Sequence, residues 1–180
     1  MLDGTRILRA FLYQPGALPM LLDEIDAIQN PGLGAALIWR SVCGYYGASN
    51  KADGCPAVLA FLVLPLILNE DLRKIVTTTF KSSGIRKFES KFVNQVDLLF
   101  SIQERAAEMR DLSRRSLALS LSTGLLALST ESALLWPRST TLTRALPSDV
   151  LKLASAAEKL GIWAQQTSLR ELCHSLRLEL

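Results

Sequence analysis

The sequence contains few of the side chains from which catalytic and metal-binding sites are built. Its single histidine, His174, would have to serve any Ser-His-Asp or Cys-His arrangement. His174 lies three residues beyond a helix-capping motif, where a surface or helix-end histidine is the simpler interpretation. Cys43 and Cys55 stand twelve residues apart and no Cys-x-x-Cys pair is present, which disfavours a zinc site. The sequence therefore predicts neither a catalytic constellation nor a metal centre.

Phosphate-binding loops are not expected either. The segment NPGLGAAL at residues 30–37 contains Gly-x-Gly, but no predicted strand precedes it and the third glycine of a dinucleotide loop is missing. No Gly-x-x-x-x-Gly-Lys-Ser/Thr motif occurs, so the chain is not expected to hydrolyse ATP by itself. We therefore predict a protein that is not an enzyme and that needs no cofactor.

Length and composition indicate one folded domain with appended helices. The 180 residues are 49% hydrophobic, and 20 basic against 17 acidic residues give a net charge of +3. Three cysteines are too few for a disulfide framework, and no leader pattern begins the chain, so a cytoplasmic location is expected. The longest apolar run, Ala57–Leu68, would reach about 18 Å as a helix. Because a bilayer core is roughly 30 Å thick, we expect this run to be a buried core element.

Basic residues concentrate in one part of the chain. Between Arg73 and Lys91, six basic residues and one acidic residue give a local net charge of +5. Phenylalanines lie among them, and cations beside aromatic rings can bind nucleic acid. The spacing of Phe88 and Phe92 favours the alternative, in which the rings are core and the lysines face solvent. The candidates for nucleic-acid contact are Lys81, Arg86, Lys87, Lys91, Arg114 and Arg115.

The periodicity of apolar residues predicts a mostly α-helical chain that would position these side chains. Helices are expected to begin at Asn30-Pro31, at Asn69 and at the capping box from Ser168 to Glu171. Residues 17–29 could form a short acidic helix, and residues 47–56 a polar loop. One buried helical stripe is expected from Val96, Leu99, Ile102, Ala106 and Met109.

The stretch from Ala118 to Ser139 has the order of elements that ends a winged helix. A helix from about Ser113 would stop at Gly124, and two short apolar runs would form a hairpin. The only charged residue from Ala118 to Pro137 is Glu131, whereas DNA-reading elements present Arg, Lys, Asn or Gln. The predicted fold is therefore mostly α (α+β), with a winged-helix-like core, one small β-hairpin and additional packing helices. Its hairpin chemistry suits protein docking.

The domain organisation follows from these elements. Residues 1–137 are predicted to form a helical domain with the winged-helix-like hairpin near residues 124–137. Residues 138–147, rich in Thr and Arg, are expected to be a linker. Residues 148–180 are expected to form C-terminal helices that pack on the same domain, with Ser148 opening the first of them.

Taken in order, several short motifs resemble the middle component of bacterial three-component ABC systems. They are the Asn30-Pro31 helix start with Trp39-Arg40 and Gly44-Tyr45-Tyr46, the run Phe61–Leu68, the Thr-rich helix end Thr77–Thr79, the helix into Gly124-Leu125-Leu126, and Lys159–Gln165 with a closing helix around Leu169–Leu172. The resemblance spans about residues 28–173. It implies an accessory protein with a winged-helix core, encoded between an SMC-like or Rad50-like ATPase and an effector, commonly a nuclease. Lamassu-type anti-phage operons are among such systems.

The resemblance also implies docking surfaces, with possible non-specific DNA contact inside the complex. The candidate interface residues are Tyr45, Tyr46, Trp136 and Trp163; for the two tyrosines and Trp163, a place in the core is an equally open interpretation. The leading hypothesis is thus a non-catalytic subunit in anti-phage or anti-plasmid defence. The alternative is a free-standing winged-helix regulator that binds DNA as a dimer.

Overall fold

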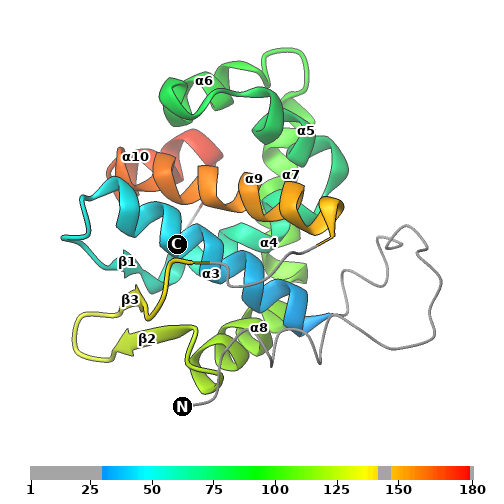
Figure 1. The fold of residues 1–180 in the computed structure, drawn as a ribbon. Coiled ribbons are helices and arrows are strands. Elements are labelled where there is room, and N and C mark those ends of the chain that lie inside the picture. Colours follow the sequence, from blue (N-terminus) through cyan, green and yellow to red (C-terminus); the bar gives the residue numbers. More distant parts are fainter. Residues whose placement is uncertain (1–29, 142–146, 179–180) are drawn as a thin grey trace.

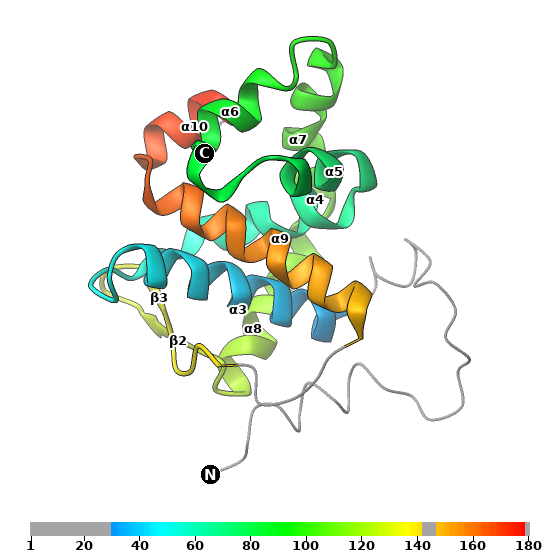
Figure 2. The same ribbon diagram turned by 45° about the horizontal axis from the view of Figure 1, so that its top comes forward.

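The protein is mostly helical with one small antiparallel sheet, which confirms the predicted α+β class (Figure 1). The computed structural model describes residues 30–141 and 147–178. The short acidic helix predicted at residues 17–29 lies outside the described residues. The strands lie at one end of the molecule and α6 (Gly84–Ser90) lies at the other (Figures 1 and 2).

The central helix is α3 (Pro31–Ala48), which begins where the sequence predicts. The Asn30 Oδ1 atom accepts hydrogen bonds from the backbone N–H groups of Gly32 (2.9 Å) and Leu33 (3.1 Å). Pro31 occupies the first turn, where a backbone N–H would have no partner within the helix, so its missing N–H costs no hydrogen bond. Residues 32–39 of this helix are all buried, so α3 is covered by other elements on every side of its first half.

Helix α9 (Ser148–Gln165) lies along α3, as both ribbon views show (Figures 1 and 2). Two glycines sit where the helices cross. A Cβ atom on Gly44 would lie 2.1 Å from the Glu158 carbonyl oxygen, and one on Gly161 would lie 1.8 Å from the Ser41 carbonyl oxygen. Since such distances are far below van der Waals contact, the two backbones can approach this closely only with glycine at both positions.

The apolar run predicted as buried core is confirmed. It forms a 3-10 turn, η1 (Ala57–Leu59), followed by α4 (Ala60–Leu68), which continues through Pro65 and is buried at every position except Phe61. Helix α5 (Glu70–Thr78) follows, and the predicted cap is present because Asn69 Oδ1 accepts from the Leu72 N–H at 2.9 Å.

The next segment contains a short 3-10 turn, η2 (Lys81–Ser83), then α6, α7 (Val96–Glu108) and α8 (Arg110–Ser122). Phe88 and Phe92 are buried with ring centroids 4.9 Å apart, which confirms the core interpretation of this pair. The predicted stripe on α7 is wrong at Val96, which is 47% exposed because it lies in the first turn, beyond the helices that cover Leu99 and Ile102.

The sheet consists of β1 (Cys55–Pro56), β2 (Leu126–Ser129) and β3 (Leu134–Pro137) in the order β1-β3-β2. The predicted hairpin is therefore confirmed. Helix α8 ends as expected at Gly124, whose φ of +72° lets the Leu125 N–H reach the Ser120 carbonyl at 2.9 Å. The expectation of a loop over residues 47–56 is wrong at both ends, because α3 continues through Ala48 and because Cys55 and Pro56 pair with β3.

The last described helix is α10 (Leu169–Leu176). Ser168 caps it as predicted, since its Oγ atom accepts from the Glu171 N–H at 3.2 Å. Leu172 and Leu176 are buried on its inner face, while His174 is exposed in its last turn, as expected for a helix-end histidine.

Candidate interaction surfaces

The motif Trp39-Arg40 on α3 holds two distant parts of the chain. The Trp39 indole N–H donates to the Ser139 carbonyl at 2.8 Å, and an Arg40 guanidinium N–H donates to the Thr140 carbonyl at 3.2 Å. Arg40 also pairs with the Glu158 carboxylate on α9. The chain that follows β3 is thus fixed to α3, and α3 is joined to α9 by charge as well as by close packing.

A lysine of α9 and the lysine that directly follows α6 satisfy the carboxyl end of α5. The Lys159 ammonium donates to the carbonyls of Val76 (2.9 Å), Thr77 (3.0 Å) and Thr79 (2.7 Å). Lys91 donates to the Thr78 carbonyl at 2.8 Å. Cations are favourable there because the last carbonyls of a helix carry partial negative charge. Burial, and then the charges of Lys81 and Lys91, lower the pKa of Lys159 from its usual value.

Trp163 lies in the core. Its side chain is 0% exposed, its ring packs against Phe88 with centroids 5.7 Å apart, and its indole N–H donates to the Lys81 carbonyl at 2.9 Å. A partner could not reach this ring without opening the packing of α6 on α9. The interface role predicted for Trp163 is therefore replaced by a core role.

Two of the predicted interface residues lie together where the sheet meets the end of α3. The rings of Tyr46 and Trp136 are in edge contact, with centroids 6.0 Å apart and planes at 76°. Both side chains are half-buried, so each keeps surface that a partner could cover. Tyr45 is also half-buried but packs against the core, and burial raises its pKa. The structure thus joins Tyr46 and Trp136 into one surface and separates them from Trp163.

Most of the cations predicted to contact nucleic acid have internal partners. Lys81 pairs with Glu158 (3.4 Å), Arg86 with Glu171 (2.6 Å) and Arg115 with Asp111 (2.9 Å), and Lys91 binds the end of α5. Lys87 and Arg114 have no ion-pair partner among residues 30–141 and 147–178. These two lie on different helices, α6 and α8, so a continuous track of free charge is not formed. Nucleic-acid contact by these residues stays a prediction.

Apolar side chains at the surface were missed by the sequence analysis. Phe80 is 78% exposed, and Val93, Val96 and Phe100 form a second exposed group around the start of α7. A signal for Phe100 was present, because it lies off the helical face that Leu99, Ile102 and Ala106 share. For Phe80 the signal was its position in the sequence, eight residues before Phe88 and outside the spacing of four that places Phe88 and Phe92 on one helical face.

Metal sites and membrane-spanning helices are two further features that the described residues do not show. Among the residues that the structure describes, no group of three or more His, Cys, Asp or Glu side chains is arranged to hold a metal ion. Within the same residues, no helix is both long and apolar enough to cross a membrane.

The comparison with protein families assigns the chain to one family. The model of the family described as ABC-three component (ABC-3C) system Middle Component 3 matches residues 20–180. The chain belongs to this family. The match confirms the resemblance to a middle component and extends it beyond residues 28–173 at both ends. No curated protein and no solved structure matches the chain. As its family's description states, this Middle Component 3 protein is one part of a multi-component system.

The three thiols of this middle component are expected to differ in reactivity. Burial raises the pKa of both Cys43 and Cys55 to about 12, so at pH 8 only a fraction on the order of 10⁻⁴ is thiolate. Cys173 is half-buried, and burial raises its pKa too. We expect Cys173 to react first with 5,5′-dithiobis(2-nitrobenzoate) and the other two to react only after unfolding. Fast reaction of two or three thiols in the native protein would contradict the burial of α3 and β1.

Proposed function

We propose that this middle component is a non-catalytic accessory subunit that links an SMC-like or Rad50-like ABC ATPase to an effector, with a nuclease as the expected effector class. The observation that carries the proposal is the family match over residues 20–180. The proposed setting is anti-phage or anti-plasmid defence of the Lamassu type, in the cytoplasm. The polar residues of the shared motifs agree with an accessory role, since Arg40, Lys159 and Trp163 bind other parts of the same chain.

The core is proposed to be winged-helix-like. Two observations support this. In the chain, α3, β1 and α4 come first and α8, β2 and β3 follow later. In the sheet, β1 lies beside β3. Residues 148–180 are proposed to belong to the same domain, because α9 lies along α3 and the two helices are joined by the ion pair between Arg40 and Glu158. In this proposal the hairpin serves protein docking, with Tyr46 and Trp136 as its aromatic contact.

The same element order favours a second candidate, a free-standing winged-helix regulator. Its chemistry is less well supported. Four of the six cations that would contact DNA are held by Glu158, Glu171, Asp111 or the end of α5. A DNA reader needs free donors that face base edges and phosphates.

Co-expression with the two neighbouring genes tests the proposal. With an affinity tag on this chain, we expect an ABC ATPase and an effector to be recovered at fixed stoichiometry. Lys87→Glu and Arg114→Glu change two of the six candidate cations, neither of which has an ion-pair partner among the described residues, and would then measure any DNA contact of the complex through its salt dependence. Recovery of the chain alone, as a soluble dimer with sequence-dependent DNA affinity below 1 µM, would contradict the subunit proposal; that threshold reflects the roughly micromolar or weaker range of non-specific binding.

A further inference from the structure

The loop that carries Phe80 is fixed on both sides by side chains of α9. On one side, Lys159 donates to the Thr79 carbonyl at 2.7 Å. On the other side, the buried indole of Trp163 donates to the Lys81 carbonyl at 2.9 Å, and Lys81 itself pairs with Glu158. Thr79 is 2% exposed, so the backbone enters this loop from the core. The loop is therefore held in one conformation by contacts that do not involve the Phe80 ring.

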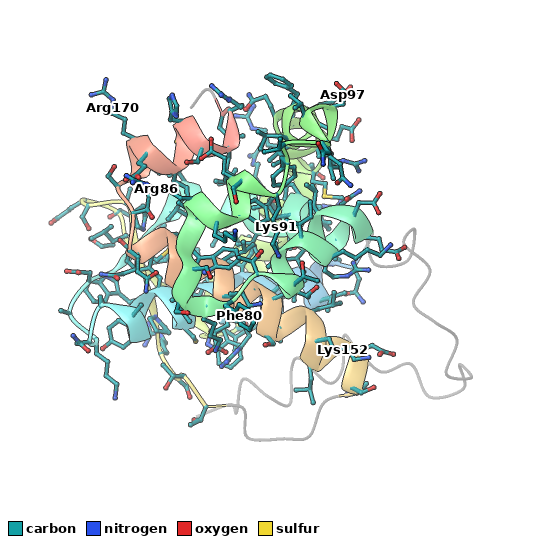
Figure 3. All side chains as sticks on the ribbon, turned by 90° about the horizontal axis from the view of Figure 1, so that it is seen from above. Phe80, Arg86, Lys91, Asp97, Lys152 and Arg170 are labelled. Atoms are coloured by element: carbon teal, nitrogen blue, oxygen red, sulfur yellow. The ribbon has the colours of Figure 1, made fainter. Side chains whose placement is uncertain are left out.

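Phe80 is nevertheless the most exposed large apolar side chain among the described residues, at 78%. Figure 3 labels Phe80 and Lys91 on the same face of the molecule. An aromatic ring on a rigid backbone loses little conformational entropy when a partner covers it. Interfaces draw much of their binding energy from a few such aromatic residues that fill a pocket on the partner. Phe80 has both properties, an apolar ring left in water and a backbone already ordered.

The surroundings of Phe80 are basic. Lys81 is next to it, and both Lys81 and Lys91 lie close enough to Lys159 for their charges to lower the pKa of the Lys159 ammonium group, after the larger effect of burial. A nucleic acid would need these ammonium groups for its phosphates, but they are bound to Glu158 and to the carbonyls of α5. Among the described residues, Glu158 is the single carboxylate paired with this group, so the three lysines keep a net positive charge, which complements carboxylates on a protein without direct contact. The arrangement therefore favours a protein partner over a nucleic acid.

We infer that Phe80 is an anchor residue that inserts into an apolar pocket, rimmed by carboxylates, on a partner subunit of the complex. The lysines beside it orient the encounter through the charges of that rim. The inference rests on the proposed function, because it supplies one contact of the proposed assembly. It also assigns to α9 the task of presenting the anchor, since Lys159 and Trp163 hold the loop.

The experiment compares Phe80→Ser with Phe100→Ser in the tagged co-expression with the two neighbouring genes. Phe100 is the matched control, because it is a phenylalanine that is also more than half exposed, at 58%, but on α7. We expect Phe80→Ser to lower recovery of one partner subunit at least tenfold, and Phe100→Ser to leave recovery within twofold of the unchanged chain. Both side chains are exposed, so we expect each variant to keep its Tm within about 2 °C.

Three outcomes would overturn the inference. If the unchanged chain recovers no partner, the proposed function fails and the anchor fails with it. If the unchanged chain recovers its partners and Phe80→Ser does so equally well, the anchor alone is wrong. If Phe80→Ser keeps the complex but loses binding to a 20-nucleotide oligothymidine, the ring is a base-stacking residue instead.

Discussion

Replacing Gly161 with alanine is expected to lower the free energy of unfolding by about 3 kcal/mol and the Tm by about 6–12 °C. The added methyl group would lie 1.8 Å from the Ser41 carbonyl oxygen and 2.8 Å from the Tyr45 nitrogen. Both atoms are backbone, so no side chain can rotate away and the two helices must separate. Separation would also strain the contact at Gly44, where a Cβ would lie 2.1 Å from the Glu158 carbonyl. Chemical denaturation followed by circular dichroism measures the loss.

Gly47 provides the matched control, because it is also a helical glycine, on α3, but faces open space. No atom lies within 4 Å of a Cβ built on Gly47, which is in the last turn of α3. Gly47→Ala is therefore expected to raise stability by about 0.5 kcal/mol, through a less flexible unfolded chain and better helix propensity. Equal stability of Gly161→Ala and Gly47→Ala would show that α3 and α9 are not in backbone contact.

The sequence predicted best those features whose causes are local. Asn30, Asn69 and Ser168 cap helices through bonds to N–H groups two or three residues away, and such bonds depend only on the adjacent sequence. The same holds for Gly124, whose positive φ ends α8. Strand β1 was missed because it is two residues long and exists only through pairing with β3, which is almost eighty residues further along the chain.

The candidate surfaces depend on distant partners, and they were correspondingly harder to predict. Motif residues of α3, α5 and α9 were noted as separate pieces of a resemblance, but no pattern showed that Arg40 meets Glu158 or that Lys159 meets the end of α5. The charge of Lys81 was visible in the sequence, while its pairing was not. The spacing of apolar residues indicated only in part that Phe88 is buried and Phe80 exposed, because exposure depends on which helices cover a given face.

These contacts give the shared motifs a structural role. Trp39 and Arg40 bind the chain after β3, and Gly44 and Gly161 allow α3 and α9 to touch. The result is a rigid base made from residues far apart in sequence. On that base the hairpin end carries Tyr46 and Trp136, and the opposite side carries Phe80. The proposed role, in which this subunit joins an ATPase to an effector, requires such separate surfaces on one body.

The second prediction concerns the charge pair that connects α3 to α9. Glu158→Gln is expected to lower the free energy of unfolding by about 2 kcal/mol, because Arg40 would keep its charge in a largely buried site without a counter-ion. The side chains of Arg40 and Glu158 are only 17% and 26% exposed, and the Arg40 Nε atom has no partner among the described residues. Lys81 would lose its partner as well. Urea denaturation of each variant gives the value.

The double variant Arg40→Met with Glu158→Met is expected to recover at least half of this loss, since no unpaired charge then remains buried. Asp149→Asn is the control, because Asp149 pairs with Lys152 at 3.5 Å on an exposed turn of the same helix. An exposed pair of this kind contributes less than about 0.5 kcal/mol. If Glu158→Gln cost no more than Asp149→Asn, water would have to reach Arg40 freely, and α3 and α9 would be joined by packing alone.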